Sequence, residues 1–190
     1  MRIVQTAILA AVLSLAAPAA TVVNFDDLPD DPFGAAVPAG YGGLNWGVDF
    51  GVWDSSSSAI YPPHSFNNVL LGNRLNQSGY AAMPVYFVTP GAEFLGAWFS
   101  GSGTALFDMY FSGNLVATSS SLNLNSTSTY LASGYSGPVD EVRLTADRGQ
   151  FVMDDFTYNP AGTAVPEPGT ALLMGLGLGA AALLGRPAIP

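Results

Sequence analysis

Two pairs of adjacent aspartates are the residues of this sequence best suited to chemistry. Asp26 and Asp27 follow a short apolar run near the N-terminus, and Asp154 and Asp155 interrupt an apolar run that ends near residue 158. Calcium prefers several oxygen ligands, and two such pairs brought together would supply carboxylates for it. Two suitably spaced carboxylates also suffice for acid/base hydrolysis of a glycosidic bond. The third interpretation is that these aspartates are solvated strand ends.

The geometry of a strand limits what a pair of adjacent aspartates can do. Side chains of neighbouring residues in a regular strand point to opposite faces. One aspartate of each pair would therefore face away from a shared site unless a β-bulge shifts the alternation. We expect at most one or two of the four carboxylates to bind a metal.

Aromatic residues are the candidates for sugar binding, because a flat ring stacks on the apolar face of a pyranose. The ligand-binding candidates are Trp46, Trp53, Trp98 and Tyr110, with Tyr61 and Tyr135 as further aromatic residues. Large rings also contribute much of the burial in a sandwich core, so a core position is the favoured alternative for each tryptophan.

Composition excludes several classes of chemistry. The chain has no cysteine, and all of its basic residues are arginines, so thiolate metal ligands, a catalytic cysteine, a P-loop and a Schiff-base lysine are excluded. Its one histidine, His64, lies in a loop fixed by Pro62 and Pro63, where we expect a solvated side chain and not a catalytic base. The net charge of −9 argues against nucleic acid. The sequence predicts no catalytic residue and no enzyme.

The pattern between residues 21 and 159 is typical of an all-β domain. Short apolar runs alternate with Gly, Pro, Asn and Ser, and no long helical periodicity occurs. The expected strands cover 22–25, 44–53 with a break at Gly47 or Gly51, 68–71, 85–88, 94–99, 105–111, 114–119, 129–131, 141–145 and 151–158. We predict a jelly-roll-like β-sandwich, with a closed barrel as the alternative.

Finer expectations concern individual strands and loops. In residues 105–111, alternation places Phe107, Met109 and Phe111 on one face and Asp108 and Tyr110 on the other, so Tyr110 is expected to be exposed. The strands at 141–145 and 151–158 flank a turn signal and are expected to form a hairpin. The serine-rich segments 55–58 and 119–128 are expected to be exposed loops.

Both ends of the chain carry targeting signals. Residues 1–20 have the basic start, apolar centre and small-residue cleavage pattern of a secretory signal peptide, with an uncleaved anchor as the alternative. The β-domain at 21–159 is followed by a linker at 160–168. Residues 169–190 contain a short apolar helix, just long enough to span a membrane, and a tail with Arg186.

Pro166, Glu167 and Pro168, followed by the Gly/Ala/Leu-rich segment and Arg186, resemble the PEP-CTERM sorting signal of Gram-negative bacteria. That resemblance implies an exosortase, a membrane-embedded processing enzyme, as partner, and a place in the cell envelope or in an exopolysaccharide system. A plain C-terminal membrane anchor is the alternative.

The aspartate pairs on the terminal strands resemble the galactose-binding-like jelly rolls of carbohydrate-binding modules. This resemblance implies that the first and last strands lie close together and share a structural calcium. We therefore predict an exported, non-enzymatic protein that binds polysaccharide in an exopolysaccharide or biofilm matrix. The alternatives are a structural surface protein without a specific ligand and a glycoside-active enzyme.

Overall fold

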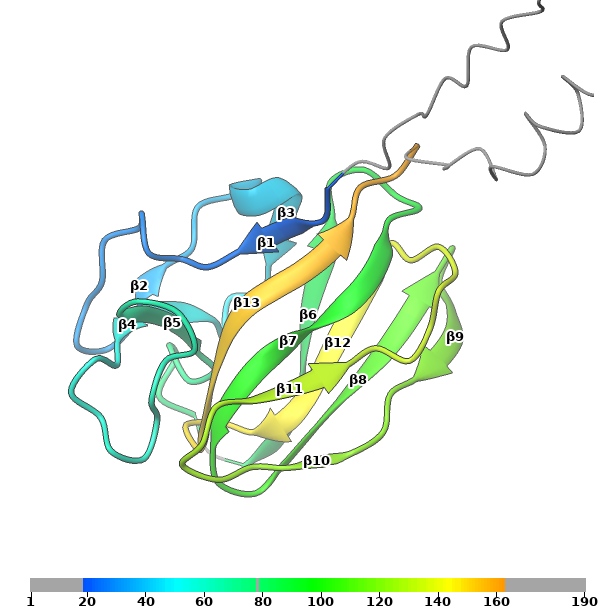
Figure 1. Ribbon diagram of the computed structural model, residues 1–190. Coiled ribbons are helices and arrows are strands. Elements are labelled where there is room, and N and C mark those ends of the chain that lie inside the picture. Colours follow the sequence, from blue (N-terminus) through cyan, green and yellow to red (C-terminus); the bar gives the residue numbers. More distant parts are fainter. Residues whose placement is uncertain (1–18, 78, 163–190) are drawn as a thin grey trace, which may run out of the picture. The chain divides into compact units, whose positions relative to one another are not determined.

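The short apolar stretches of the sequence fold into two antiparallel β-sheets that pack face to face (Figure 1). The structure is a computed structural model and describes residues 19–77 and 79–162. The sorting motif at Pro166, Glu167 and Pro168, the C-terminal helix and nearly all of the signal peptide lie outside the described residues. Within the described ranges, no helix has the length and apolar character needed to cross a membrane.

The first sheet has the strand order β11-β7-β13-β5-β4-β2, and β1 also pairs with β13. Its strands are β1 (Thr21–Val23), β2 (Ala35–Ala36), β4 (Gly51–Asp54), β5 (Asn68–Leu71), β7 (Glu93–Gly101), β11 (Thr129–Ala132) and β13 (Phe151–Asn159).

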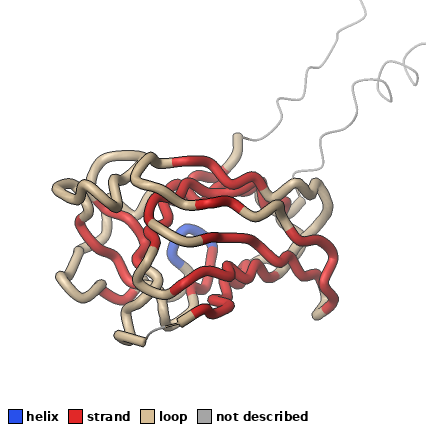
Figure 2. The backbone as a smooth tube through the Cα atoms, turned by 90° about the horizontal axis from the view of Figure 1, so that it is seen from below, coloured by secondary structure: helices blue, strands red, loops and turns tan. Residues whose placement is uncertain are grey.

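The second sheet has the order β10-β8-β12-β6-β3, and β9 also pairs with β8. Its strands are β3 (Leu44–Trp46), β6 (Tyr80–Phe87), β8 (Thr104–Phe111), β9 (Asn114–Thr118), β10 (Leu122–Asn123) and β12 (Glu141–Asp147). The described residues also include one short 3-10 turn, η1 (Tyr41–Gly43), drawn in blue in Figure 2.

Aromatic side chains from both sheets meet in the core. Phe107 on β8 packs edge-on against Phe94 on β7 at a ring-centroid distance of 4.7 Å, and it also contacts Phe99 at 5.6 Å. All three rings are at most 1% exposed. Burial of such apolar surface is the main force holding the sheets together, and this arrangement is consistent with the predicted β-sandwich.

The alternation predicted for β8 is confirmed up to Tyr110, whereas Phe111 at the end of the strand is half-buried. Phe107 and Met109 are fully buried, whereas Asp108 and Tyr110 are partly exposed on the opposite face. The expected break between residues 44 and 53 is also confirmed, because β3 and β4 belong to different sheets.

The predicted hairpin of residues 141–145 and 151–158 is wrong. β12 pairs with β6 and β8 in the second sheet, whereas β13 pairs with β7, β5 and β1 in the first. The turn between them crosses from one sheet to the other. Both strands occupy central positions with neighbours on each side, and such long-range pairing is not encoded in the turn residues.

The sequence predicts exposed loops at residues 55–58 and 119–128, but each of these serine-rich segments contains a buried serine. Ser55 is fully buried, and its backbone N–H donates to the carbonyl of Asn67 at 2.9 Å. Ser119 is 8% exposed, and its hydroxyl oxygen accepts from the backbone N–H of Phe107 at 2.9 Å. Both serines satisfy backbone groups where a strand ends, which explains their burial.

The first and last strands are neighbours. Thr21 of β1 lies opposite Tyr158 of β13, and Val23 lies opposite Phe156. The two ends of the described domain therefore lie at the same end of the sandwich, as Figure 1 shows. This proximity was expected from the sequence, and it places Asp26 and Asp27 just beyond β1, on the side of β13.

Candidate functional site

A β-bulge in β13 carries the second aspartate pair. Between Asp154 and Thr157 the register against β7 shifts by one residue. Asp155 is the extra residue, and it has the left-handed backbone conformation with φ of 47°. Such bulges bend a strand and redirect side chains.

The bulge reverses the in-and-out alternation along β13. Before it, Phe151 and Met153 face the core; after it, Phe156 and Tyr158 face the core. The two residues between them, Asp154 and Asp155, therefore both lie on the outer side of the sheet. Asp154 is 2% and Asp155 9% exposed, because the loop between β4 and β5 covers them. The sequence had left open whether a bulge would bring adjacent aspartates together, and the structure contains that bulge.

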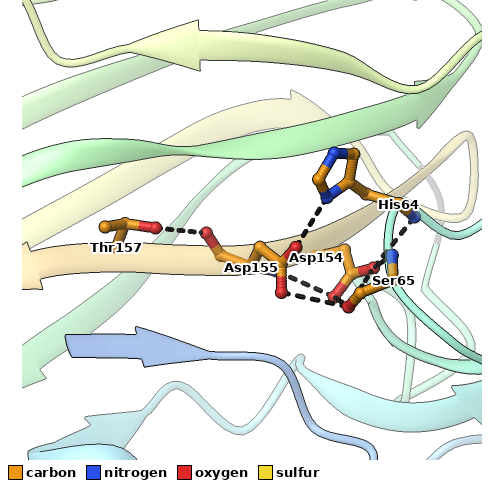
Figure 3. Close-up of polar contacts among 5 residues, drawn as sticks. All are labelled: His64, Ser65, Asp154, Asp155 and Thr157. Atoms are coloured by element: carbon orange, nitrogen blue, oxygen red, sulfur yellow. Dashed lines mark hydrogen bonds and ion pairs between the residues drawn. The ribbon is translucent and has the colours of Figure 1, made fainter. Parts of the chain in front are cut away.

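Asp154 holds the covering loop through backbone hydrogen bonds (Figure 3). Its Oδ2 accepts from the backbone N–H of His64 at 2.9 Å and of Ser65 at 2.8 Å. Its Oδ1 accepts from the backbone N–H of Asp155 at 2.8 Å. The carboxylate is thus saturated by donors from its own strand and from the loop.

Asp26 holds the far end of the same segment. Its Oδ1 accepts from the backbone N–H groups of Asn67 at 3.2 Å and Asn68 at 3.1 Å, where β5 begins. Asp26 at one end and the Asp154–Asp155 pair at the other therefore bind residues 64–68, although they are far apart in the sequence.

Asp155 connects the bulge to an aromatic strip on the outer face of the first sheet. Its Oδ2 lies 2.6 Å from Nδ1 of His64, and the imidazole stacks on Trp98 with ring centroids 3.6 Å apart and planes 12° apart. Trp98 in turn contacts Tyr130, its direct neighbour on β11, at 5.5 Å between centroids. We call Tyr130, Trp98 and His64 the aromatic strip.

The pKa of Asp154 is raised to about 6, mainly by burial and in smaller part by the negative charge of Asp155. The backbone N–H groups of Ser65, Asp155 and His64 act in the opposite direction, because they stabilise the ionised carboxylate. Asp154 is therefore a carboxyl group that changes its charge in weakly acidic solution.

The cluster does not have the geometry of a nucleophile activated by a base. The hydroxyl of Ser65 donates to Oδ1 of Asp155 at 3.0 Å and lies 3.3 Å from Oδ2 of Asp154. In a catalytic triad the serine would donate to the imidazole, which would be oriented by the acid. Here serine and histidine both bind carboxylates, and the cluster ties the loop to the sheet.

The predicted ligand-binding residues lie in different parts of the sandwich. Trp46 is half-buried at the edge of the core, against Phe25 at 5.2 Å and Phe156 at 5.3 Å. Trp98 belongs to the aromatic strip, and Trp53 is half-buried against Tyr61 of the β4–β5 loop, at 6.2 Å.

Tyr110 lies on the outward face of the other sheet. The guanidinium of Arg143 covers its ring at 4.1 Å from the centroid, and Arg143 also pairs with Glu141 at 2.6 Å. Tyr110 is therefore separate from the three tryptophans, and the structure does not bring the four residues together.

The metal-binding candidates are engaged mainly in hydrogen bonds within the domain. Asp27 accepts from the hydroxyl of Tyr41, and burial, together with this bond, raises the pKa of the tyrosine. Oδ2 of Asp26 is buried and has no hydrogen-bond partner among the described residues. Within residues 19–77 and 79–162, no group of three or more His, Cys, Asp or Glu side chains is arranged to hold a metal ion. Calcium binding stays a prediction.

Sequence reasoning missed Tyr130 and undervalued His64. Tyr130 lies between Thr129 and Leu131, and because Leu131 is buried, alternation turns Tyr130 outward. That signal was present in the predicted strand at 129–131. The position of His64 depends on how a loop folds back over a bulged strand, and the sequence gives no local sign of it.

The fold and site define a two-sheet β-sandwich in which a loop, held by Asp26, Asp154 and Asp155, lies beside partly exposed aromatic rings. Residues 164–186 match the family of the PEP-CTERM protein-sorting motif. The match includes Pro166, Glu167 and Pro168 and confirms the predicted sorting signal. It supports export, sorting by an exosortase and association with the envelope. A comparison of the whole chain with curated proteins found no match.

Proposed function

We propose that this protein is a non-enzymatic, polysaccharide-binding component of the cell envelope or its matrix. The PEP-CTERM protein-sorting motif at residues 164–186 supports the location. The ligand is proposed from the aromatic strip, which offers the kind of surface that sugar rings contact.

The observation that carries the proposal is the continuity of the aromatic strip. Three rings from the β4–β5 loop, β7 and β11 touch one another in sequence on the outward side of the first sheet. Tyr130 is 38% exposed, and its ring is tilted by 56° from that of Trp98. The two rings therefore offer a sugar two faces with different orientations. An amphipathic ring of this kind combines an apolar face with a hydroxyl at its tip.

The hydrogen bonds that hold the β4–β5 loop on the sheet support a role in binding. A ligand gains affinity when the residues that contact it are already ordered. His64 is held from both sides, by Asp155 at Nδ1 and by Trp98 against its ring. The cluster of aspartates therefore fixes one end of the aromatic strip before any ligand arrives.

A non-enzymatic role is supported by the way the carboxylates are used. Hydrolysis of a glycosidic bond by paired carboxylates requires them to be about 5–10 Å apart across the sugar. Asp154 and Asp155 are adjacent in sequence, at most 9% exposed, and both bind Ser65.

The experiment is a glycan array followed by affinity electrophoresis in soluble polysaccharides. It uses residues 19–162, which form one compact unit. We expect Tyr130→Ala to weaken binding about tenfold, or about 1.4 kcal/mol. The matched control is Tyr86→Ala, because Tyr86 is 45% exposed on the opposite sheet. Absence of binding to every glycan, or equal weakening by both variants, would refute the proposal.

A further inference from the structure

One long segment of this acidic protein carries no charge. The chain has a net charge of −9, yet residues 112–139 contain no Asp, Glu, Lys, Arg or His. Serine, threonine and asparagine provide most of the polar groups in this segment, which includes β9, β10 and β11.

The fold places these three strands along one side of the sandwich. β9 and β10 lie on the outer side of β8, at the edge of the second sheet, and β11 forms the edge of the first sheet. Figure 1 shows all three on the side away from β2, β4 and β5. We call residues 112–139 the uncharged edge.

Each of these strands has one paired side. Among the described residues, β9 and β10 pair only with β8, and β11 pairs only with β7. The outward backbone N–H and C=O groups of an edge strand are a template for pairing with another strand. β9 has five residues and β11 has four, whereas the edge strands on the other side of the sandwich, β2 and β3, have two and three.

β9 also presents apolar side chains to solvent. Leu115 is 55% and Val116 37% exposed. Proteins commonly protect edge strands with lysine, proline or inward-pointing charges. The nearby acids are already engaged: Asp108 accepts from the hydroxyl of Thr118 at 2.6 Å, and Asp140 accepts from the backbone N–H of Ser112 at 2.6 Å.

We propose that the uncharged edge is a self-association surface, on which β9 pairs with β9 of a second copy of this chain. For two acidic copies of this chain, this side opposes contact least. Two acidic copies repel each other wherever their charged surfaces meet, whereas the uncharged edges approach without burying a charge. Contact between the same patch on both copies gives a closed, two-fold dimer.

The proposed contact is made by β9 in the second sheet and needs no glycan, whereas Tyr130, which also belongs to the uncharged edge, lies on β11 in the first sheet. All of the described core residues come from residues 23–158, so the fragment 19–162 contains the complete described core. Sedimentation velocity of this fragment over a range of concentrations, without added glycan, tests the association.

The test variants are Val116→Lys and Leu115→Lys, which place a charge on the edge. The matched control is Val88→Lys, because Val88 is 54% exposed and lies outside the uncharged edge. All three variants change the net charge equally, and thermal unfolding verifies that each is folded. We expect the wild type and the control to dimerise with rising concentration, and each test variant to associate about tenfold or more weakly, because burial of an unpaired charge is costly.

Salt provides a second readout. Screening of the acidic surfaces at high ionic strength is expected to strengthen the wild-type dimer relative to its state at about 0.15 M salt. A wild type that stays monomeric up to its solubility limit overturns the proposal. Equal dimerisation of Val116→Lys, Leu115→Lys and Val88→Lys overturns it as well, because the contact would then lie elsewhere.

Discussion

Nδ1 of His64 lies 2.6 Å from Oδ2 of Asp155, although the two residues are 91 positions apart in the sequence. The contact depends on the bulge in β13, because a regular alternation would turn Asp155 towards the core. The bulge, the covering loop and the aromatic strip are therefore parts of one arrangement, and changes at Asp155 affect all three.

Replacement of Asp155 distinguishes its backbone role from its side-chain role. Asp155→Ala removes the contacts to His64 and Ser65 and places alanine at φ of 47°. We expect it to lower the free energy of unfolding by about 3 kcal/mol, from lost hydrogen bonds and left-handed strain. Asp155→Asn keeps an acceptor and tolerates this conformation, so a loss of about 1 kcal/mol is expected. Urea unfolding measures both, and equal losses would contradict the role of the side chain.

The raised pKa of Asp154 predicts a pH dependence of stability. A carboxyl group with a folded-state pKa of about 6, against 3.8 for its ordinary value, binds its proton more tightly in the folded protein. Its contribution to stability is therefore fully present below pH 3.8 and is lost as the pH rises through about 6. The difference corresponds to about 3 kcal/mol.

The control for this pH dependence is Asp154→Asn, which cannot titrate. Urea unfolding from pH 4 to pH 7 should show the wild type losing stability relative to the variant by roughly the amount that linkage predicts. Direct titration of the Asp154 carboxyl by NMR is the second measurement. Parallel pH profiles for the two proteins would show that Asp154 has an ordinary pKa.

The local pattern of the sequence was sufficient for much of the fold. Period-two alternation predicted the buried positions of Phe107 and Met109 and the outward position of Tyr110. In a strand with one face towards solvent, apolar and polar side chains alternate along the sequence. The same alternation turns Tyr130 outward, because its neighbour Leu131 is buried. These are short-range properties that need no knowledge of partner strands.

The pairing of strands and the geometry of the site required long-range information. The hairpin predicted for β12 and β13 failed because two adjacent strands with a good turn between them can enter different sheets. The sequence shows that a bulge is needed for both aspartates to face one site, but it does not show whether or where a bulge occurs. The position of the bulge depends on the register between β13 and β7. The partial burial of Trp46 likewise depends on which elements cover its strand.

Structural calcium at the two aspartate pairs remains a proposal, and chelation tests it. Oδ2 of Asp26 supports it, because this buried oxygen has no hydrogen-bond partner among the described residues. Calcium at about 100 times its dissociation constant would add about 2.7 kcal/mol to the free energy of unfolding. We expect EDTA to lower the Tm by several degrees and Asp26→Asn to abolish that response. Asp30→Asn, an exposed acid in the same loop, is the control. An unchanged Tm on chelation would leave the pairs with their hydrogen-bonding role alone.

Gly96 links the pairing of β7 and β11 to the position of Tyr130. Its φ is 146°, and a Cβ at this position would overlap the carbonyl oxygen of Leu131 and lie 2.7 Å from the hydroxyl oxygen of Tyr130. Gly96→Ala is therefore expected to force β11 away from β7, with a larger loss of stability than backbone strain alone would cause. Because Tyr130 moves with β11, glycan binding should weaken in the same variant.

Gly113→Ala separates backbone strain from steric overlap. Gly113 has φ of 75°, and a Cβ added there meets no atom within 4 Å. This control should lose about 1 kcal/mol from left-handed strain and keep its glycan binding. Urea unfolding and affinity electrophoresis of both variants provide the comparison. If Gly96→Ala costs no more than Gly113→Ala, the close contact of β7 with β11 does not determine where Tyr130 lies.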